Sequence, residues 1–515
     1  MEYIFLKFHI YYLGVIYLLI GMYIPDISFT IDYLSTALWL SALGIYFHAI
    51  SITIVMGISP LIAILEFIGL YKNNDLLLRL AKKLSIVVVV AFGFGAATGT
   101  LVEFGLIQVW NTSLLIIASF AFAPLFFELV AFTLEAGLAI ALVYTWGRFR
   151  NPWMHWLITV SYAFGALLSG ALITSVNSWI QVPWGVGDLV NKIYPWAPIY
   201  GPQVVDAQAL LEIKRAALRV TEAGGVFSSY INPDVLSKFF GEGRRLLYDP
   251  WITFSSPYTI VSIYHQLLAT FIAGTAWVLA GLAYKILRGD EEYIGPFKLV
   301  ASISALSLLI QGLVGHEMGV NVYKYQPTKF ALLAGLISSG PDPFAGLTMF
   351  GDPNYVFDGF DRLIEEAARG GMVINGVNIA LRDTMAAMTN ISIIYPMYMT
   401  KISLAVISGL IGIFYLICFI KKDFLRGRER IQFILAYPYA FMLTLVPILG
   451  WAVREIGRKP WTIYGLFYPE EVITPIPISP YVAAAIIGGI LVGIVLMIYT
   501  IYRVLVKPPS FLESD

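Results

Sequence analysis

The sequence has little charge and almost no cysteine. Asp, Glu, Lys and Arg make up 13% of its 515 residues, about half of their share in an average soluble domain. The 33 acidic residues balance the 33 basic ones, so the formal net charge is zero. This balance excludes nucleic-acid binding through bulk positive charge, and the composition excludes a disordered chain. The single cysteine, Cys418, excludes an intramolecular disulfide or a thiolate metal cluster.

Hydrophobic residues, by contrast, are abundant and gather in long continuous runs. They make up 58% of the chain, against about 45–50% in soluble domains. A helix needs about 20 mostly apolar residues to span a bilayer. Ten segments meet this requirement: 4–24, 36–68, 84–107, 112–146, 155–180, 257–286, 296–318, 391–420, 431–454 and 478–503. The sequence therefore predicts an all-α polytopic membrane protein, a bundle of about ten transmembrane helices.

The charge on the connections predicts the orientation of these spans. Basic residues fall in alternate connections and at the tail, within 72–83, 148–150, 285–298, 421–430 and 503–507. Because cytoplasmic loops carry the excess of Lys and Arg, we expect this face to be cytoplasmic. Both termini then lie in the cytoplasm, in a multi-pass protein of the cell membrane. We expect residues 1–32 to be a retained anchor, since no small-residue cleavage site follows the first span.

Seven ionisable side chains lie at membrane depth: His48, Glu103, Glu128, Glu135, His265, His316 and Glu455. A charge in the middle of a bilayer costs about 2.5–3.5 kcal/mol on the insertion scale, so such residues need a function or a partner. From a helical rise of about 1.5 Å per residue, the three histidines and Glu455 fall in the outer half of the membrane. Histidines on separate helices at matched depth indicate a metal or haem site. For any one of them alone, the alternative is a hydrogen-bonded core histidine.

Two carboxylates form a column on one predicted helix. Glu128 and Glu135 are seven residues apart, about two turns, so both face the same way about 10.5 Å apart along the axis. Such a column suits a proton relay; the alternative is two separate carboxylates with polar neighbours. A proton-coupled secondary transporter would also use it, but the sequence shows no inverted repeats with broken helices. Glu66 lies near the inner end of its span and is expected to be interfacial.

Six motifs follow one another along the chain. They are Tyr46-Phe-His48; Ala123-Pro124 with Glu128 and Glu135; Asn177-Ser-Trp179-Ile-Gln181-Val-Pro183; Tyr264-His265; Gly315-His316-Glu-Met-Gly319 with Gln326-Pro-Thr-Lys329; and Glu455-Ile-Gly-Arg458-Lys-Pro-Trp461. Together they resemble subunit I of the cytochrome bd-type quinol oxidases. The resemblance covers residues 36–503, which hold nine of the predicted spans, and leaves the first span as an addition.

The resemblance implies a role for each motif. His265 would be an axial ligand of a low-spin haem b. His48 and Glu455 would bind the two high-spin haems, one a haem b and the other a haem d or a third haem b. Arg458 and Trp461 would flank that site, since an Arg suits a haem propionate as a bidentate donor. Glu128 and Glu135 would carry protons from the cytoplasmic side to the oxygen-reducing haem, and Gln326 and Lys329 would lie at the quinol site on the outer face.

The sequence departs from the family pattern at two points. The methionine that serves as second low-spin ligand falls on Ser403, so Met399, about one turn earlier, is the expected ligand, with Met397 or a different ligand as alternatives. The glutamate expected five residues after the quinol-loop lysine is Ala334. Glu317 and Asp342 are the nearest acids that can replace it.

The motifs divide the chain into six parts. These are an extra N-terminal anchor, 1–32; a four-helix part with a high-spin ligand and the proton-path glutamates, 33–180; a long outer loop, 181–256; two helices with the low-spin ligand, 257–318; a short quinol-type loop, 319–390; and three helices with the Glu-x-Gly-Arg-x-Pro-Trp motif and tail, 391–515.

We therefore expect the haem-bearing subunit of a terminal oxidase, a quinol:oxygen oxidoreductase. It would oxidise quinol at the outer face and reduce oxygen to water with cytoplasmic protons, beside a second membrane subunit in the lipid bilayer. No nucleic acid is expected as a partner. The alternatives are a proton-coupled transporter and a paralogue with altered or lost quinol binding.

Overall fold

The structure, a computed structural model, describes most of the chain in several ranges. These are 31–110, 113–114, 117, 121–184, 251–369, 372–374, 377–379, 381–421, 428–465, 467–469, 473 and 479–506. Within these ranges nine helices are long and apolar enough to cross a membrane. The all-α polytopic prediction is thus confirmed for nine spans. The predicted first span, 4–24, and most of the long outer loop lie outside the described residues.

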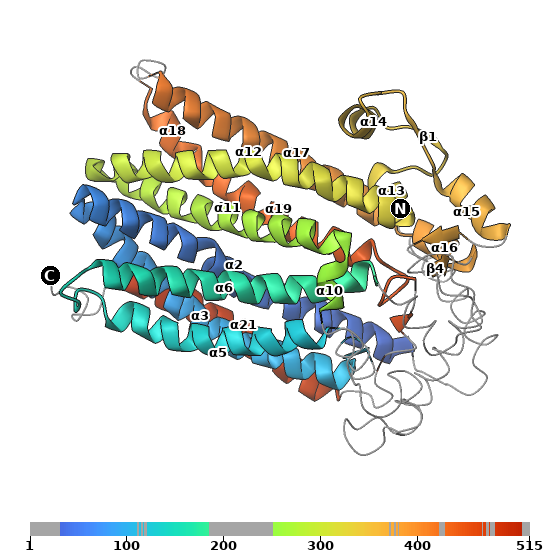
Figure 1. The fold of residues 1–515 in the computed structure, drawn as a ribbon, viewed down its shortest axis with the longest axis horizontal. Helices are drawn as coiled ribbons and strands as arrows, with labels where there is room; N and C mark the ends of the chain where they lie inside the picture. The colour runs from blue at the N-terminus through green and yellow to red at the C-terminus, as the bar shows by residue number, and fades with distance from the viewer. Residues whose placement is uncertain are drawn as a thin grey trace.

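The long helices lie along the longest axis of the molecule (Figure 1). They are α2 (Ile31–Lys72), α3 (Asp75–Val109), α5 (Phe122–Tyr144), α6 (Trp153–Gln181), α11 (Pro257–Leu287), α12 (Ile294–Tyr325), α17 (Ile391–Ile420), α19 (Ala436–Ile456) and α21 (Pro480–Val506). Two short helices, α10 (Ile252–Ser255) and α18 (Arg430–Ile434), and the 3-10 turn Glu291–Tyr293 adjoin them. Of the predicted span over 112–146, α5 covers Phe122–Tyr144, and most of residues 112–120 lie outside the described residues.

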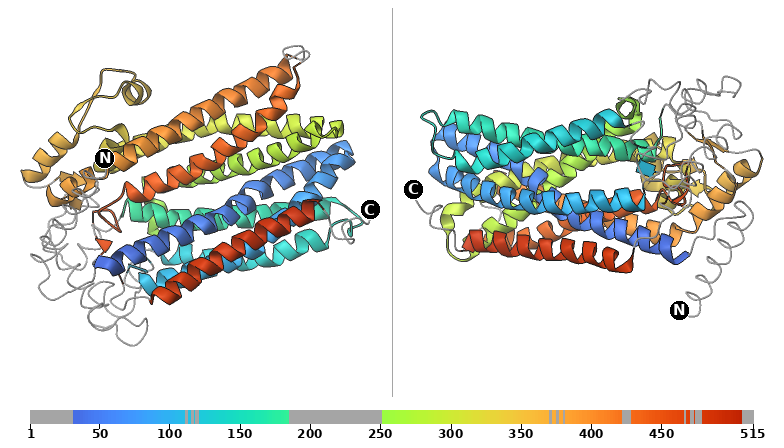
Figure 2. Two further views of the ribbon diagram at one scale, coloured as in Figure 1. Left: turned by 180° about the vertical axis from the view of Figure 1, so that it is seen from behind. Right: turned by 90° about the horizontal axis from the view of Figure 1, so that it is seen from below.

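Helix α11 lies at the centre of the bundle, in contact with α2, α6, α12 and α19. Helices α3, α5 and α21 lie on the side of α2 and α6, and α17 lies on the side of α12 (Figures 1 and 2). Two glycines bring α2 and α11 unusually close. A Cβ added at Gly274 would lie 2.5 Å from the backbone carbon of Gly57, so only glycine fits at this crossing.

The predicted quinol-type loop, 319–390, is a folded cap rather than an open loop. It contains α13 (Pro327–Ala334), α14 (Pro343–Phe350), α15 (Phe360–Ala368) and α16 (Leu381–Met388). Strand β1 (Gly340–Pro341) pairs antiparallel with β2 (Val356–Phe357), and β3 (Met372–Ile374) pairs antiparallel with β4 (Val377–Ile379).

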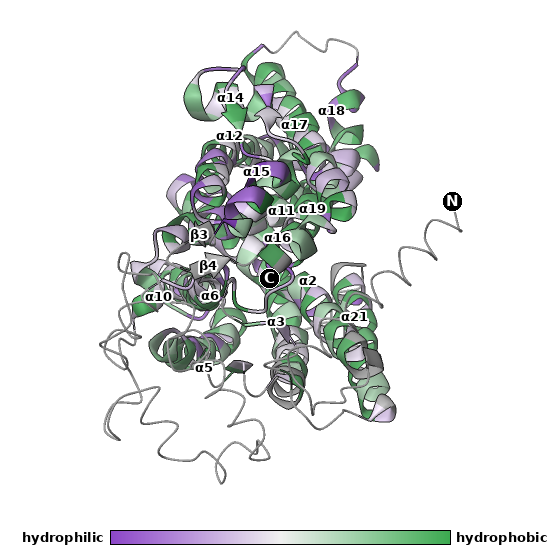
Figure 3. Ribbon diagram, turned by 90° about the vertical axis from the view of Figure 1, so that its right-hand side faces the viewer, coloured by the Kyte–Doolittle hydropathy of each residue, from purple (hydrophilic) through white to green (hydrophobic). Residues whose placement is uncertain are grey.

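The cap gathers at one end of the bundle, where α15 shows a hydrophilic surface (Figures 1 and 3). Helix α15 buries Phe360 and Leu363 against α13 and leaves the ion pair between Glu365 and Arg369 exposed. Trp461 and Tyr464, which follow α19, belong to the same buried cluster as α13. The cap is therefore anchored to the part of the chain that carries the Glu-x-Gly-Arg-x-Pro-Trp motif.

Candidate functional site

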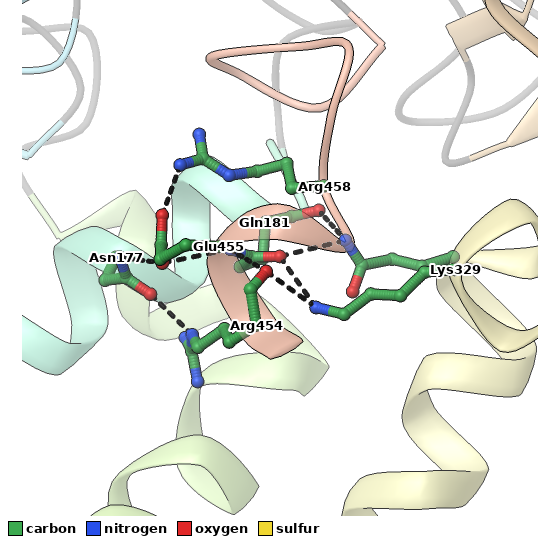
Figure 4. A network of polar contacts seen from close by, with 7 residues as sticks. Asn177, Gln181, Lys329, Arg454, Glu455 and Arg458 are labelled. Atoms are coloured by element: carbon green, nitrogen blue, oxygen red, sulfur yellow. Dashed lines mark hydrogen bonds and ion pairs between the residues drawn. The ribbon is translucent and has the colours of Figure 1, made fainter. Parts of the chain in front are cut away.

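A buried polar network surrounds Glu455 at the end of α19 (Figure 4). Its Oε1 accepts hydrogen bonds from Asn177 Nδ2 at 3.0 Å and from Gln181 Nε2 at 3.4 Å, and its Oε2 accepts from Arg458. Asn177 and Gln181 are four residues apart on α6, so both face α19 from one side of that helix. The sequence motifs that contain these residues are thus brought together in space, although they are far apart in the chain.

Gln181 links this carboxylate to the start of the cap. Lys329 Nζ donates to Gln181 Oε1 and to the Arg454 backbone oxygen, both at 3.1 Å. Gln326 Nε2 donates to Gln181 O at 3.0 Å and to its Oε1 at 3.1 Å. Both Lys329 and Gln326 are buried. The two residues predicted for the quinol site on the outer face therefore lie inside the protein and share a network with Glu455.

The network holds more positive than negative charge. Three basic residues, Lys329, Arg454 and Arg458, share the network with one carboxylate, Glu455 (Figure 4). Arg454 donates to Asn177 Oδ1 at 2.5 Å and to Ser178 Oγ at 3.1 Å. Burial, and then the charge of Arg454, lowers the pKa of Lys329 well below its usual range, which reduces this excess of charge.

Arg458 presents hydrogen-bond donors that nothing in the described residues uses. It is 7% exposed, and its Nε and Nη1 have no hydrogen-bond partner among these residues. Buried guanidinium donors without partners are costly, and they match the planar carboxylates of haem propionates. The donor set around Glu455 therefore fits an anionic prosthetic group with propionate side chains.

His48 is held on α2 in a form suited to metal ligation. Its Nδ1 lies 3.1 Å from Thr98 Oγ1 on α3, and Thr98 Oγ1 also lies 2.9 Å from the Phe94 carbonyl oxygen. Since that hydroxyl donates to the carbonyl, it accepts from Nδ1–H, which leaves the lone pair on Nε2. Gly99 makes room for the ring, because a Cβ there would lie 2.8 Å from His48 Cε1.

His265 on α11 is oriented by α12. Gln311 Nε2 lies 3.0 Å from His265 Nδ1 and 3.1 Å from the His265 backbone oxygen, while Gln311 Oε1 has no partner among the described residues. With the amide N–H donating to Nδ1, the ring proton is on Nε2. Turning the amide would let Oε1 accept from Nδ1–H and free Nε2 for iron, with loss of the hydrogen bond to the His265 backbone oxygen. Gly315 lies beside the ring: a Cβ added to this glycine would lie 3.7 Å from His265 Cε1.

The paired glutamates of α5 face α6. Ser169 Oγ donates to Glu128 Oε1 at 3.1 Å. Glu135 is 4% exposed and lies beside Tyr162 of α6. Both carboxyl groups thus lie on one face of α5, as their spacing predicts, and each has a polar neighbour on α6. The Glu103 side chain lies outside the described residues.

Comparison with known proteins places the chain in a family. The model of the cytochrome bd terminal oxidase subunit I family matches residues 36–507. The chain belongs to this family. A putative cytochrome bd menaquinol oxidase subunit I of Bacillus subtilis is 25% identical over 446 residues, which cover 83% of this chain and 86% of that protein. A cytochrome bd ubiquinol oxidase subunit 1 of the same organism is 23% identical over 83% of each chain.

A solved bd oxidase structure shares the fold. The bd oxidase from Geobacillus thermodenitrificans superposes with a TM-score of 0.68 at 18% identity, over 94% of this chain and 99% of that one. The predicted fold is thereby confirmed, and the match of the family model confirms the predicted family. Members of this bd family typically carry haems, and the chain is a multi-pass membrane protein.

The remaining expected residues of this bd subunit lie apart from the network. Met399 on α17 is 37% exposed, and Ser403 and His316 are exposed as well. Met397 is half-buried against the cluster around α13. Among the described residues, no three His, Cys, Asp or Glu side chains form a metal cluster. Haem iron does not need one, because it takes only one or two ligands from the protein, and Met399 as second low-spin ligand stays a prediction.

Sequence analysis missed several residues of the site and misjudged one. Arg454 could have been found from the sequence, because it is a basic residue at membrane depth directly before Glu455. Gln311 gave none, because a neutral amide is common in a span. Glu66 does lie near the end of α2, but it is 2% exposed, because His155 and Thr159 of α6 cover its carboxylate. Depth along a helix says nothing about such lateral packing.

Proposed function

We propose that this subunit oxidises quinol at the outer face of the cell membrane and reduces oxygen to water with protons from the cytoplasm. Its termini would both be cytoplasmic, and a second membrane subunit would complete the enzyme. The observation that carries the proposal is the Glu455 network. It combines a carboxylate positioned by two amides with an arginine whose free nitrogens suit a propionate.

The proposed haem sites follow from the side chains at hand. His265 and Met399 would hold a low-spin haem b. His48 and Glu455 would hold a high-spin haem b and a haem d or third haem b. These haems would supply the electron transfer and the oxygen chemistry. The residues around them orient the ligands: Thr98 fixes the tautomer of His48, and Asn177 and Gln181 fix the Glu455 carboxylate.

The donor site would lie at the start of α13, with Gln326 and Lys329. Because both side chains are buried, a quinol oxygen would have to approach along the cap rather than at an open surface. Asp342 is engaged as the N-cap of α14, where its carboxylate accepts from Ala345 N, and Glu317 is exposed on α12. Among the contacts described, neither acid bonds to Lys329 or its partners, so neither replaces the acid that the family pattern has there. The second candidate function is therefore that of a subunit with altered quinol binding.

Protons would move along the α5–α6 interface. Glu135 would take a proton from the inner side and pass it to Glu128, whose carboxylate is held by Ser169. From Glu128 the proton would reach the oxygen-reducing site in the outer half of the bundle. The two carboxyl groups, about 10.5 Å apart by helix geometry, need an intervening polar group or water to exchange a proton.

The test is oxygen uptake with a series of quinols by the purified complex, in wild type, Glu135→Gln and Glu128→Gln. Glutamine keeps the size of the side chain and removes its titratable proton. We expect Glu135→Gln to slow turnover about tenfold or more, in line with the contribution of a proton-transfer group, with haem content retained. Full activity in both variants would refute the relay. A haem-replete wild type that oxidises no quinol would point to a different electron donor.

A further inference from the structure

Helices α5 and α6 meet in a register that repeats every seven residues. They run antiparallel, and the contacts pair Glu128 with Ser169, Glu135 with Tyr162, and the Leu142 carbonyl with His155. Each step advances seven residues on α5 and goes back seven on α6. Seven residues are about two turns or 10.5 Å, so the polar groups form a ladder with even steps. The first two steps hold the glutamates already assigned to the relay.

The third step contains a buried acid–base pair from α2 and α6. His155 Nδ1 lies 2.6 Å from Glu66 Oε1, and Thr159 Oγ1 donates to Glu66 Oε2 at 2.6 Å. Glu66, His155 and Thr159 are all at most 4% exposed. The relay proposed above uses none of them.

The hydrogen bonds fix how many protons this pair holds. His155 Nε2 lies 2.9 Å from the Leu142 carbonyl oxygen. A carbonyl can only accept, so Nε2 carries a hydrogen. One further proton lies between Nδ1 and Oε1, on the imidazole or on the carboxyl group. In either form the pair is neutral overall, so it can stay buried without an uncompensated charge.

The pair lies at the cytoplasmic end of the ladder. Glu66 is in the last two turns of α2, His155 is at the start of α6, and the Leu142 carbonyl is near the end of α5. The connections beyond these ends carry the exposed basic residues Lys72, Arg148 and Arg150. By the positive-inside rule this is the side from which protons are taken up.

Two hydroxyl groups of α6 lie between the pair and Glu135 along the helix. Thr159 and Tyr162 are three residues apart on α6 and therefore neighbours on one face of the helix. Tyr162 Oη lies beside the Glu135 carboxyl group, yet among the described residues neither Tyr162 Oη nor Glu135 Oε1 has a hydrogen-bond partner. Buried polar atoms without a hydrogen-bond partner are where proteins recruit an internal water.

We propose that the Glu66–His155 pair is the cytoplasmic loading site of the proton path, feeding Glu135 through Thr159 and Tyr162. A proton from cytoplasmic water binds the pair, which then carries one positive charge. The pair releases one proton to Thr159 Oγ1, and the Thr159 proton passes through an internal water to the Tyr162 oxygen. The Tyr162 proton then moves to the Glu135 carboxylate, so that each hydroxyl ends with one proton. The pair returns to its neutral state. This inference rests on the proposed oxidase function.

The test mixes the fully reduced complex with oxygen and follows proton uptake with a pH-indicator dye, in the whole enzyme with its haems. Glu66→Gln keeps the size of the side chain and removes its proton. Thr159→Val keeps the Glu66–His155 contact and removes only the hydroxyl. The matched control is Thr174→Val, which removes a buried hydroxyl of α6 that donates to Gln266 at 2.6 Å, about 100° around the helix from His155.

We expect Glu66→Gln and Thr159→Val to slow proton uptake about tenfold or more, with haem spectra and unfolding temperature unchanged, and Thr174→Val to match wild type. Wild-type uptake in both, while Glu135→Gln is slow, would overturn the loading site and leave the oxidase function intact. Loss of fold or haem in Glu66→Gln together with normal uptake in Thr159→Val would make the pair a structural contact only. If wild type itself takes up no protons with oxygen, the oxidase function fails.

Discussion

At the scale of single residues, Lys329 shows how burial changes the chemistry of a side chain. Burial and the neighbouring Arg454 lower its pKa well below the usual range. A neutral amine has two N–H groups, which match the two acceptors, Gln181 Oε1 and the Arg454 carbonyl, and it keeps a lone pair. Where Ala334 replaces the acid of the family pattern, we propose that the amine form of Lys329, which the lowered pKa makes easier to reach, is the proton acceptor for a quinol.

This reading predicts that Lys329 acts as a base rather than as a fixed cation. Arg cannot lose its proton in a protein, so Lys329→Arg should lower quinol turnover about a hundredfold, within the range of a general base, and Lys329→Met should do the same. The wild-type kcat/KM should rise with pH as the amine loses its proton, and Lys329→Arg should abolish this rise. Steady-state oxygen uptake from pH 6 to 9 measures both. Wild-type rates in Lys329→Arg would show that only the charge matters.

The lowered pKa of Lys329 also makes the stability of the folded protein depend on pH. The unfolded chain binds the lysine proton more tightly than the folded one, whose pKa is depressed. Stability therefore rises with pH between the depressed pKa of Lys329 and the ordinary lysine value of about 10.4. Below that window the folded protein bears the full cost of the buried ammonium.

At the scale of helices and loops, the sequence predicts the elements that depend on local composition. It does not predict the elements that form through contacts with distant parts of the chain. Long apolar runs were enough to find nine of the spans. The cap over 319–390 was predicted as a loop, because helices as short as α13 and α14 form through tertiary contacts rather than propensity. The motifs predicted Glu455 and Arg458, whereas the positions of Arg454, Gln311 and His155 depend on which helices pack together.

The crossing of α2 and α11 supplies a test at this scale. These helices carry His48 and His265, and a Cβ at Gly274 would meet backbone atoms of Gly57 that cannot move aside. Gly274→Ala should destabilise the protein by about 1–3 kcal/mol, as overpacking does, and lower its unfolding temperature. Gly281→Ala on the same helix is the control, since nothing lies within 4 Å of a Cβ there. Equal unfolding temperatures for the two variants would contradict the close crossing.

At the scale of the whole molecule, charge is arranged across the bundle. The cationic network of Glu455 lies at the end that holds the cap, and the Glu66–His155 pair lies toward the opposite end, with the carboxyl groups of α5 between them. The sequence predicted the family. It did not predict that Glu66 of α2 contacts His155 of α6, because position along each helix can be read from the sequence whereas the contacts between two helices cannot.

The most direct measurement is the reduced-minus-oxidised visible spectrum of the purified complex, in wild type, His265→Ala and Met399→Leu. We predict haem bands in wild type, with the low-spin signal lost or converted to high-spin in His265→Ala and in Met399→Leu. A normal low-spin signal in Met399→Leu would move the second ligand to Met397 or to a residue other than methionine. A wild-type complex without haem bands, or a low-spin signal unchanged in His265→Ala, would contradict the claim that this chain carries haem.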